Sequence, residues 1–246
     1  MKKQTIKLGN SAGVLLPKEW LNGIVEVKLV RPPINEKELL KELLEKLQKY
    51  LPNIIGIYLV GSYARNDHDT NSDIDILVIT DKINKLIKIG NYEIILKSEE
   101  TLKKTISNNL YLLSLIKEAK PLINKKLLEK YSKIKNNLNI KKIKKEIENM
   151  SNINKESIDF SIEYKQDLID GIAYSLVLRL RELYLLKCIV KNKIPNKKEL
   201  IGKIPKNVYE AYIRVKRNHK QLNNLNPKDA ETTYNLIKKW LKELKD

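Results

Sequence analysis

Two apolar, β-branched runs stand out in the first half of the chain. The first covers Ile54–Val60 and ends at Gly61-Ser62, where the pattern becomes polar. The second covers Ile74–Thr80 and carries Asp73 and Asp75 at its start. Because short β-branched runs bounded by polar turns are typical of buried strands, we expect two neighbouring strands here.

Helical periodicity surrounds these two runs. A short strand is expected over 92–96, after a connector at 81–90, and amphipathic patterns predict helices on either side. These elements predict an α+β domain over residues 34–131, a small mixed sheet with helices packed on one face. The expected helices cover residues 36–50, 100–119 and 121–131, the last opened by a proline at its first position.

The polar residues at the strand ends are placed to act together. Side chains two apart on a strand point to the same face, so Asp73 and Asp75 should project side by side. A hard divalent cation relieves their repulsion, and Mg²⁺ binds carboxylates together with substrate phosphates. Across the turn, Gly61 allows a ligand to approach the backbone and Ser62 offers a hydroxyl. A short helix beginning there would aim N–H groups at phosphate oxygens.

Gly61-Ser62, ten intervening residues and Asp73-Ile74-Asp75 resemble the G-S-x10-D-x-D motif of the DNA polymerase beta-like nucleotidyltransferase superfamily. The sequence GSYAR…SDIDILV is similar to that of the minimal nucleotidyltransferases, the MntA-type protein adenylyltransferases of toxin–antitoxin systems. The resemblance implies transfer of AMP from ATP to a hydroxyl acceptor, with two Mg²⁺ ions held by the aspartates. Gly61 and Ser62 would grip the β and γ phosphates. Arg65 would neutralise triphosphate charge, or else lie on a helix surface.

The resemblance also implies a third carboxylate from a later strand, and Glu93 is the candidate. It would join Asp73 and Asp75 at the metal and take the proton from the attacking hydroxyl; alternatively, it is an exposed residue of an alternating strand. Family members commonly have Gly where this chain has Asn66, and Asn is the residue that best tolerates the same left-handed backbone. The loop residues Asp67, Asp69 and His68 are expected to be solvated.

Residues 1–31 are expected to form a small β unit with strands at 5–8, 14–17 and 24–30. The wording LGNSAGVLLPKEWLNGIVEVKLV is similar to AbrB-type swapped-hairpin modules, which dimerise and often bind DNA. Because so small a unit cannot bury a core alone, it needs a partner chain, as in a homodimer, or the neighbouring domain. DNA binding through residues 1–30 and simple dimerisation or docking both remain open. The paired prolines after Arg31 mark the boundary.

The C-terminal half is expected to be helical. Residues 132–155 read as a basic helical linker, with nucleic-acid contact as the alternative, and residues 156–246 as an antiparallel bundle that binds substrate or resembles HEPN domains. Helices are expected at 157–191, with a break near Gly171, at 208–222 and from 226 to 244.

Arg214 and His219 fit the R-x4-6-H pattern of HEPN ribonucleases, which would imply attack on a phosphodiester. However, residues five apart on a helix point in different directions, and a surface or substrate-facing His219 is the alternative. The tyrosine that is adenylylated in the toxin partners of MntA, two positions after the histidine, is replaced here by Gln221.

The net charge of +18 indicates either a polyanionic partner or the lysine-rich composition of a thermophile, since 42 of the 48 basic residues are lysine. Residues 50–81 contain no lysine, so the acidic site is expected to be free of competing cations. The single cysteine, Cys188, excludes a disulfide framework and gives no zinc site. No apolar run approaches the roughly 18 residues of a membrane span, and no signal peptide is evident, so we expect a cytoplasmic protein.

The acceptor is open from sequence alone. The MntA-like wording favours a protein hydroxyl. A fused helical domain is also similar to the small-molecule nucleotidyltransferases that modify aminoglycosides, although a strongly basic bundle argues against a cationic drug. A DNA-binding regulator that only senses nucleotide is the alternative from a different class.

Overall fold

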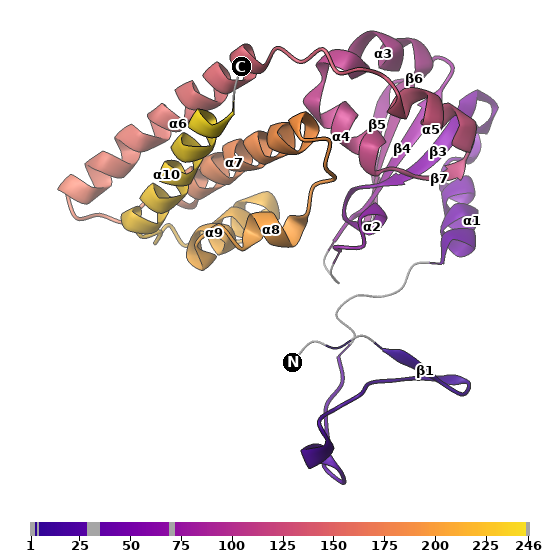
Figure 1. Cartoon of the computed structure of the whole chain (residues 1–246), viewed down its shortest axis with the longest axis horizontal. Coiled ribbons are helices and arrows are strands. Elements are labelled where there is room, and N and C mark those ends of the chain that lie inside the picture. Colours follow the sequence, from indigo (N-terminus) through magenta and orange to yellow (C-terminus); the bar gives the residue numbers. More distant parts are fainter. Residues whose placement is uncertain (1–2, 4, 29–34, 69–71, 245–246) are drawn as a thin grey trace.

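The computed structural model describes residues 3, 5–28, 35–68 and 72–244 (Figure 1). A small N-terminal β unit is followed by an α+β domain built on a central sheet and then by a set of C-terminal helices. The predicted α+β class, with additional helices beyond the sheet domain, is therefore confirmed.

A five-stranded mixed sheet forms the centre of the α+β domain. The strand order is β5-β6-β4-β3-β7, with β4 and β6 parallel and the other neighbours antiparallel. The C-terminal end of β3 therefore meets the N-terminal ends of β4 and β6. The strands are β3 (Ile54–Val60), β4 (Ile74–Thr80), β5 (Lys85–Ile89), β6 (Tyr92–Ser98) and β7 (Lys120–Ile123).

Two of these strands differ from the sequence-based expectation. Residues 81–90, expected as a connector, contain β5, which pairs antiparallel with β6 at the edge of the sheet. Pro121 does not begin a helix but lies in β7 opposite Tyr58. Proline is tolerated in an edge strand such as β7, because no further strand needs its missing N–H group.

Helices cover both faces of the sheet, whereas the sequence pattern predicted helices on one face. Side chains alternate along β3, so that Ile57 and Leu59 join one core cluster and Tyr58 and Val60 join the other. The first cluster contains α1 (Glu36–Lys46) and the short α2 (Gly61–Ala64) that follows β3. The second contains α3 (Glu99–Thr105), α4 (Leu110–Glu118) and α5 (Lys125–Ser132).

The C-terminal helices share the second core cluster, which continues from the sheet into the bundle. Two long helices, α6 and α7, take the place of the single helix predicted over 157–191. Helix α6 begins within the predicted linker, continues past its expected end at residue 155, and packs against α7 and α10. The helices are α6 (Ile140–Glu163), α7 (Asp170–Val190), α8 (Lys197–Ile201), α9 (Lys206–Lys216) and α10 (Pro227–Glu243).

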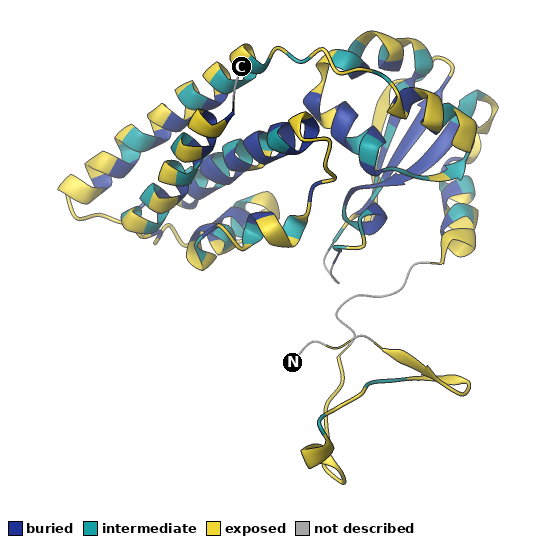
Figure 2. Ribbon diagram, in the orientation of Figure 1, coloured by how far each residue is buried: buried dark blue, intermediate teal, exposed yellow. Residues whose placement is uncertain are grey.

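The N-terminal unit is an antiparallel hairpin of β1 (Ile6–Leu8) and β2 (Ser11–Gly13). The expected strand at 14–17 is not formed, and the third expected strand is absent from 24–28; its last two residues and the boundary at Arg31 lie outside the described residues. Apolar side chains in this unit stay on the surface, and Ile24 is fully exposed (Figure 2). DNA binding and dimerisation by this unit stay predictions.

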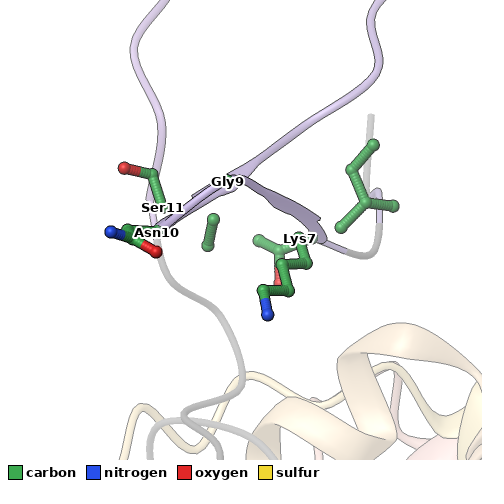
Figure 3. Close-up of a pocket in the computed structure, with 7 residues that line it drawn as sticks. Lys7, Gly9, Asn10 and Ser11 are labelled. Atoms are coloured by element: carbon green, nitrogen blue, oxygen red, sulfur yellow. The ribbon is translucent and has the colours of Figure 1, made fainter.

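A hollow of about 620 Å³ lies beside this hairpin, and Lys7, Gly9, Asn10 and Ser11 contribute to its wall (Figure 3). All of its lining residues come from 5–12, so it lies within the N-terminal unit and not against the sheet domain. Within the described part of the chain, no helix is long and apolar enough to cross a membrane.

Candidate functional site

The turn after β3 and the start of β4 are packed directly against each other. Gly61 follows Val60 with a φ of +69°, a backbone conformation that favours glycine. A Cβ atom at this position would lie 2.1 Å from Oδ2 of Asp75. The second aspartate of the motif therefore requires glycine at position 61, because only a residue without a side chain leaves room for its carboxylate.

Two neighbouring strands, β4 and β6, bring the predicted carboxylates together at one end of the sheet, beside the end of β3. Asp75 lies opposite Val60 on β3 and opposite Glu93 on β6, and Asp73 precedes β4 by one residue. Burial, and after it the negative charges of Glu93 and Asp73, raise the pKa of Asp75 from its ordinary value of 3.8 to about 6. The three carboxylates therefore repel one another, as expected for a site that binds a cation.

Glu93 is half-buried and its carboxylate lies 3.3 Å from Nζ of Lys88 on the neighbouring edge strand. Asp73 is exposed. Among the described residues, no three acidic, histidine or cysteine side chains gather closely enough to form a ready-made metal cluster. Carboxylate oxygens are ligands that suit Mg²⁺, which commonly binds one or two carboxylates together with phosphate oxygens of a nucleotide.

Two cations from the bundle oppose these carboxylates. The positive charges of Lys216, at the end of α9, and Arg181, on α7, both act to lower the pKa of Asp75. Lys216 has an exposed surface, yet the protein crowded around its ammonium group and the charge of Arg181 lower its pKa, against the opposing pull of Asp73 and Asp75.

Sequence reasoning missed these two cations. Residues 50–81 contain no lysine, but the expectation that the acidic site is free of cations does not hold for the folded protein. The sequence offers little signal for either residue, because each is one of 48 basic side chains and lies more than 100 positions after the motif.

Arg65 and Glu118 form a buried brace beneath the turn. Glu118, at the end of α4, accepts a hydrogen bond from the Gly61 N–H at 2.9 Å and pairs with Nη1 of Arg65 at 2.6 Å. Burial raises the pKa of Glu118, and the charge of Arg65 opposes that rise. The guanidinium that was expected to face the triphosphate is thus engaged by Glu118 and, at 3.1 Å, by Asp67. Glu118 was also missed from the sequence; its one signal is a charge at the end of the otherwise apolar helix that it terminates.

The loop after α2 is packed rather than solvated, which corrects the expectation for two of its residues. Asp67 accepts a hydrogen bond from the backbone N–H of Lys197 at 2.8 Å and so joins the motif loop to the start of α8. His68 is buried, and its ring stacks on Tyr63 with centroids 3.9 Å apart. Asn66 has a φ of 58°, which confirms that asparagine adopts the left-handed backbone here. Asp69 lies outside the described residues.

Comparison with known protein families shows to which family this chain belongs. The model of the nucleotidyltransferase domain family matches residues 40–215, which include the five-stranded sheet, the motif and Arg181, and end one residue before Lys216. The chain belongs to the nucleotidyltransferase domain family.

Individual relatives of this nucleotidyltransferase are distant. A protein of Methanocaldococcus jannaschii, whose name assigns it provisionally as a protein adenylyltransferase, is 47% identical over 49 residues. That match covers 20% of this chain and 49% of the relative, so the chain spans about half the length of the curated relative it matches.

Two solved structures are similar at low identity. A spectinomycin adenyltransferase of Enterococcus faecialis, determined with ATP and spectinomycin, is 16% identical with a TM-score of 0.41, covering 85% of this chain and 100% of that one. A nucleotidyltransferase-like protein of Exiguobacterium sibiricum is 13% identical with a TM-score of 0.33, covering 85% and 75%.

The second candidate pair of this nucleotidyltransferase, Arg214 and His219, is not brought together as a site. The Arg214 guanidinium donates two hydrogen bonds, of 2.7 and 2.8 Å, to the fully buried carboxylate of Asp170. Asp170 also accepts from the backbone N–H of Leu222 at 3.1 Å. His219 lies beyond the end of α9 and is exposed. Arg214 therefore holds the start of α7 to α9 and the loop that follows it.

Proposed function

We propose that this protein transfers AMP from ATP to a hydroxyl group on a protein acceptor. The observation that carries the proposal is the opposition of charges across one site. Asp73, Asp75 and Glu93 lie at neighbouring strand ends, and the positive charges of Arg181 and Lys216 act on Asp75 from the bundle. A metal-bound nucleoside triphosphate carries both matching charges, with cations for the carboxylates and phosphate oxygens for the basic side chains.

The oxygen donors at the sheet edge fit Mg²⁺. Burial and the neighbouring like charges together raise the pKa of Asp75 to about 6, and a bound divalent cation would stabilise its charged form. We assign Asp73, Asp75 and Glu93 as the residues that would hold two Mg²⁺ ions per site. When bound, these ions supply Lewis-acid stabilisation of the charge on the transferred phosphate.

The chain's own groups have distinct tasks in the proposed transfer. Arg181 and Lys216 neutralise the triphosphate, a task that replaces the one predicted for Arg65, whose guanidinium braces the turn. Ser62 donates its hydroxyl to the β or γ phosphate, and Gly61 contributes by leaving space, since its N–H is held by Glu118.

Glu93 is assigned a second task as the base. It is half-buried and stands beside Asp75 in the register of the sheet, where it could accept the proton of the acceptor hydroxyl as the oxygen attacks the α phosphate. Pyrophosphate leaves on the side of the basic residues.

A protein acceptor is favoured over a cationic small molecule. The motif wording resembles that of MntA-type enzymes, and the Methanocaldococcus relative carries a protein adenylyltransferase name. A chain with a net charge of +18 would also repel a cationic drug. Acting on a protein hydroxyl, the enzyme would silence or activate its target, as in a toxin–antitoxin pair.

The test is transfer of label from α-³²P-ATP in the presence of Mg²⁺ and a lysate of the source organism. We expect label on a protein band with the wild type and none with the Asp73→Asn/Asp75→Asn double variant. Label recovered only in a small-molecule fraction would contradict a protein acceptor but retain the transferase. Binding of Mg²⁺–ATP with no labelled product would indicate a nucleotide-sensing regulator.

A further inference from the structure

The net charge of the chain is concentrated in its helical half. Residues 34–131 contain 16 basic and 14 acidic side chains, whereas residues 132–246 contain 26 basic and 14 acidic ones. The charged composition of a thermophile raises acids together with lysines, because its charges form networks of ion pairs. The excess of bases in one half of the chain therefore favours a negatively charged partner over a thermophile's composition.

Much of this excess lies at one end of the bundle. The start of α6 meets the C-terminal end of α10, where Nζ of Lys144 donates a hydrogen bond of 2.7 Å to the Leu244 carbonyl. The end of α7 joins them, since Nζ of Lys187 lies 2.6 Å from a carboxylate oxygen of Glu243. We call the surface of residues 141–148, 187–191 and 238–243 the basic end; it contains nine lysines and three acids. Figure 1 shows it away from α2 and the motif turn.

The acids of the basic end do not neutralise it. Each is matched by one lysine, in the pairs Lys142–Glu146, Lys238–Glu148 and Lys187–Glu243, with nitrogen–oxygen distances of 3.9, 2.6 and 2.6 Å. Five further lysines of this surface are exposed, namely Lys141, Lys145, Lys191, Lys239 and Lys242. Lys239 and Lys242 also line a hollow of about 540 Å³ on α10. The surface therefore presents positive charge that its own acids do not offset.

Helix electrostatics explain only part of this arrangement. Lysines at the C-terminal ends of α7 and α10 interact favourably with the partial negative charge of a helix end. At the N-terminal end of α6 the same charge is unfavourable, yet four of the first six residues are lysines and no residue of the first turn is acidic. An anion bound at the basic end would offset the repulsion among these lysines.

The residue types favour the phosphates of double-stranded DNA as that anion. Duplex DNA carries one negative charge per about 1.7 Å of its axis, twice the density of a single strand. All basic residues of this surface are lysines, which contact phosphates as point charges without reading the bases. Single strands are normally bound through exposed aromatic rings, but Trp240, the aromatic residue of these three segments, is buried. Double-stranded RNA is recognised by its 2′-hydroxyls as well as its phosphates.

We propose that the basic end binds the phosphate backbone of double-stranded DNA, independently of base sequence. Because this surface lies away from the motif turn, the contact leaves the nucleotide site open and does not depend on AMP transfer.

Fluorescence anisotropy of the full chain with a labelled DNA duplex of about 20 base pairs tests the proposal at salt concentrations from about 50 to 200 mM. We expect micromolar binding at the lowest salt. Lys141→Ala/Lys145→Ala/Lys242→Ala should weaken it at least about 10-fold and reduce the slope of log affinity against log salt by about 2 to 3. Since these lysines are exposed, the variant should keep the circular dichroism spectrum of the wild type.

The matched control is Lys37→Ala/Lys41→Ala/Lys82→Ala, which removes the same charge from exposed positions of the sheet domain and should bind as the wild type does. Equal losses in the two triple variants would overturn the proposal, because net charge alone would then attract the DNA. No loss in either variant would also overturn it and would place the contact on another surface, such as the N-terminal hairpin.

The choice of ligand has its own test. A single strand of the same length and a polyglutamate of equal charge should both bind more weakly than the DNA duplex, because their charges are farther apart. Tighter binding of the single strand or of an RNA duplex, or displacement of DNA by polyglutamate at equal charge, would contradict the assignment to double-stranded DNA. Absence of duplex binding at the lowest salt would overturn the proposal outright.

Discussion

Gly61 shows that packing against neighbouring residues determines which residue the motif can have at a position. Gly61 has a positive φ and leaves the space that Asp75 fills, while its N–H group is held by Glu118. Gly61, which the sequence predicts as a phosphate-binding residue, therefore also makes room for the Asp75 carboxylate and donates a hydrogen bond to Glu118.

Gly61→Ala should harm this protein more than a comparable change elsewhere. Gly90 also has a positive φ, of +58°, but a Cβ there would meet nothing within 4 Å. Both alanine variants add backbone strain of about 1 kcal/mol, and only Gly61→Ala also displaces the carboxylate of Asp75. We expect urea unfolding to show a further loss of about 1–3 kcal/mol for Gly61→Ala, together with loss of transfer activity. Equal effects of the two substitutions would show that the contact with Asp75 is unimportant.

Asp75 should reduce stability in the metal-free protein. Its folded-state pKa, about 6, lies above its ordinary value of 3.8, so the unfolded chain ionises first as pH rises. The free energy of unfolding of the wild type therefore decreases as the pH rises from about 4 to about 6. Asp75→Asn cannot ionise, and in EDTA above about pH 7 its free energy of unfolding should exceed that of the wild type by about 1–3 kcal/mol.

The same comparison at low pH is the control. Below about pH 4 Asp75 is protonated in both states, and the advantage of Asp75→Asn should nearly vanish. A variant that is less stable than the wild type in EDTA at neutral pH would show that Asp75 has a structural partner and not a repulsive site.

At the scale of elements, the sequence pattern predicts what is local and apolar. The β-branched runs of β3 and β4 agree with the structure at both ends. β5 is missed because it is an edge strand whose residues are mostly exposed, so no buried run marks it. β7 is missed because Pro121 is equally compatible with a helix start and an edge strand. Only pairing with β3 decides between them.

The packing of α9 gives a sharp test of the HEPN-like pattern. Arg214→Ala would leave Asp170 buried and unpaired, so it should cost about 3–5 kcal/mol in the free energy of unfolding. His219→Ala removes an exposed side chain five residues away and should change it by less than about 0.5 kcal/mol. Metal-independent RNA cleavage that is lost in His219→Ala would contradict the structural role assigned to Arg214.

At the scale of the whole molecule, the site depends on contacts that no local pattern contains. The motif and the third carboxylate could be named from sequence, because they lie within about 35 positions and follow strand geometry. Arg181 and Lys216 could not, since only the folded arrangement of α7 and α9 brings these two cations near enough for their charges to act on Asp75. The proposed site thus combines carboxylates of the sheet, which the motif predicts, with cations of the helical bundle, which it does not.

Calorimetric binding of Mg²⁺ with a non-hydrolysable ATP analogue tests this two-sided site most directly. Arg181→Ala/Lys216→Ala should weaken binding about 10- to 100-fold, because contacts from charged groups to phosphate are lost. The matched variant Lys239→Ala/Lys242→Ala removes the same charge from the exposed surface of α10 and should bind as the wild type does. Equal affinity in both double variants would contradict a nucleotide held between the sheet edge and the bundle.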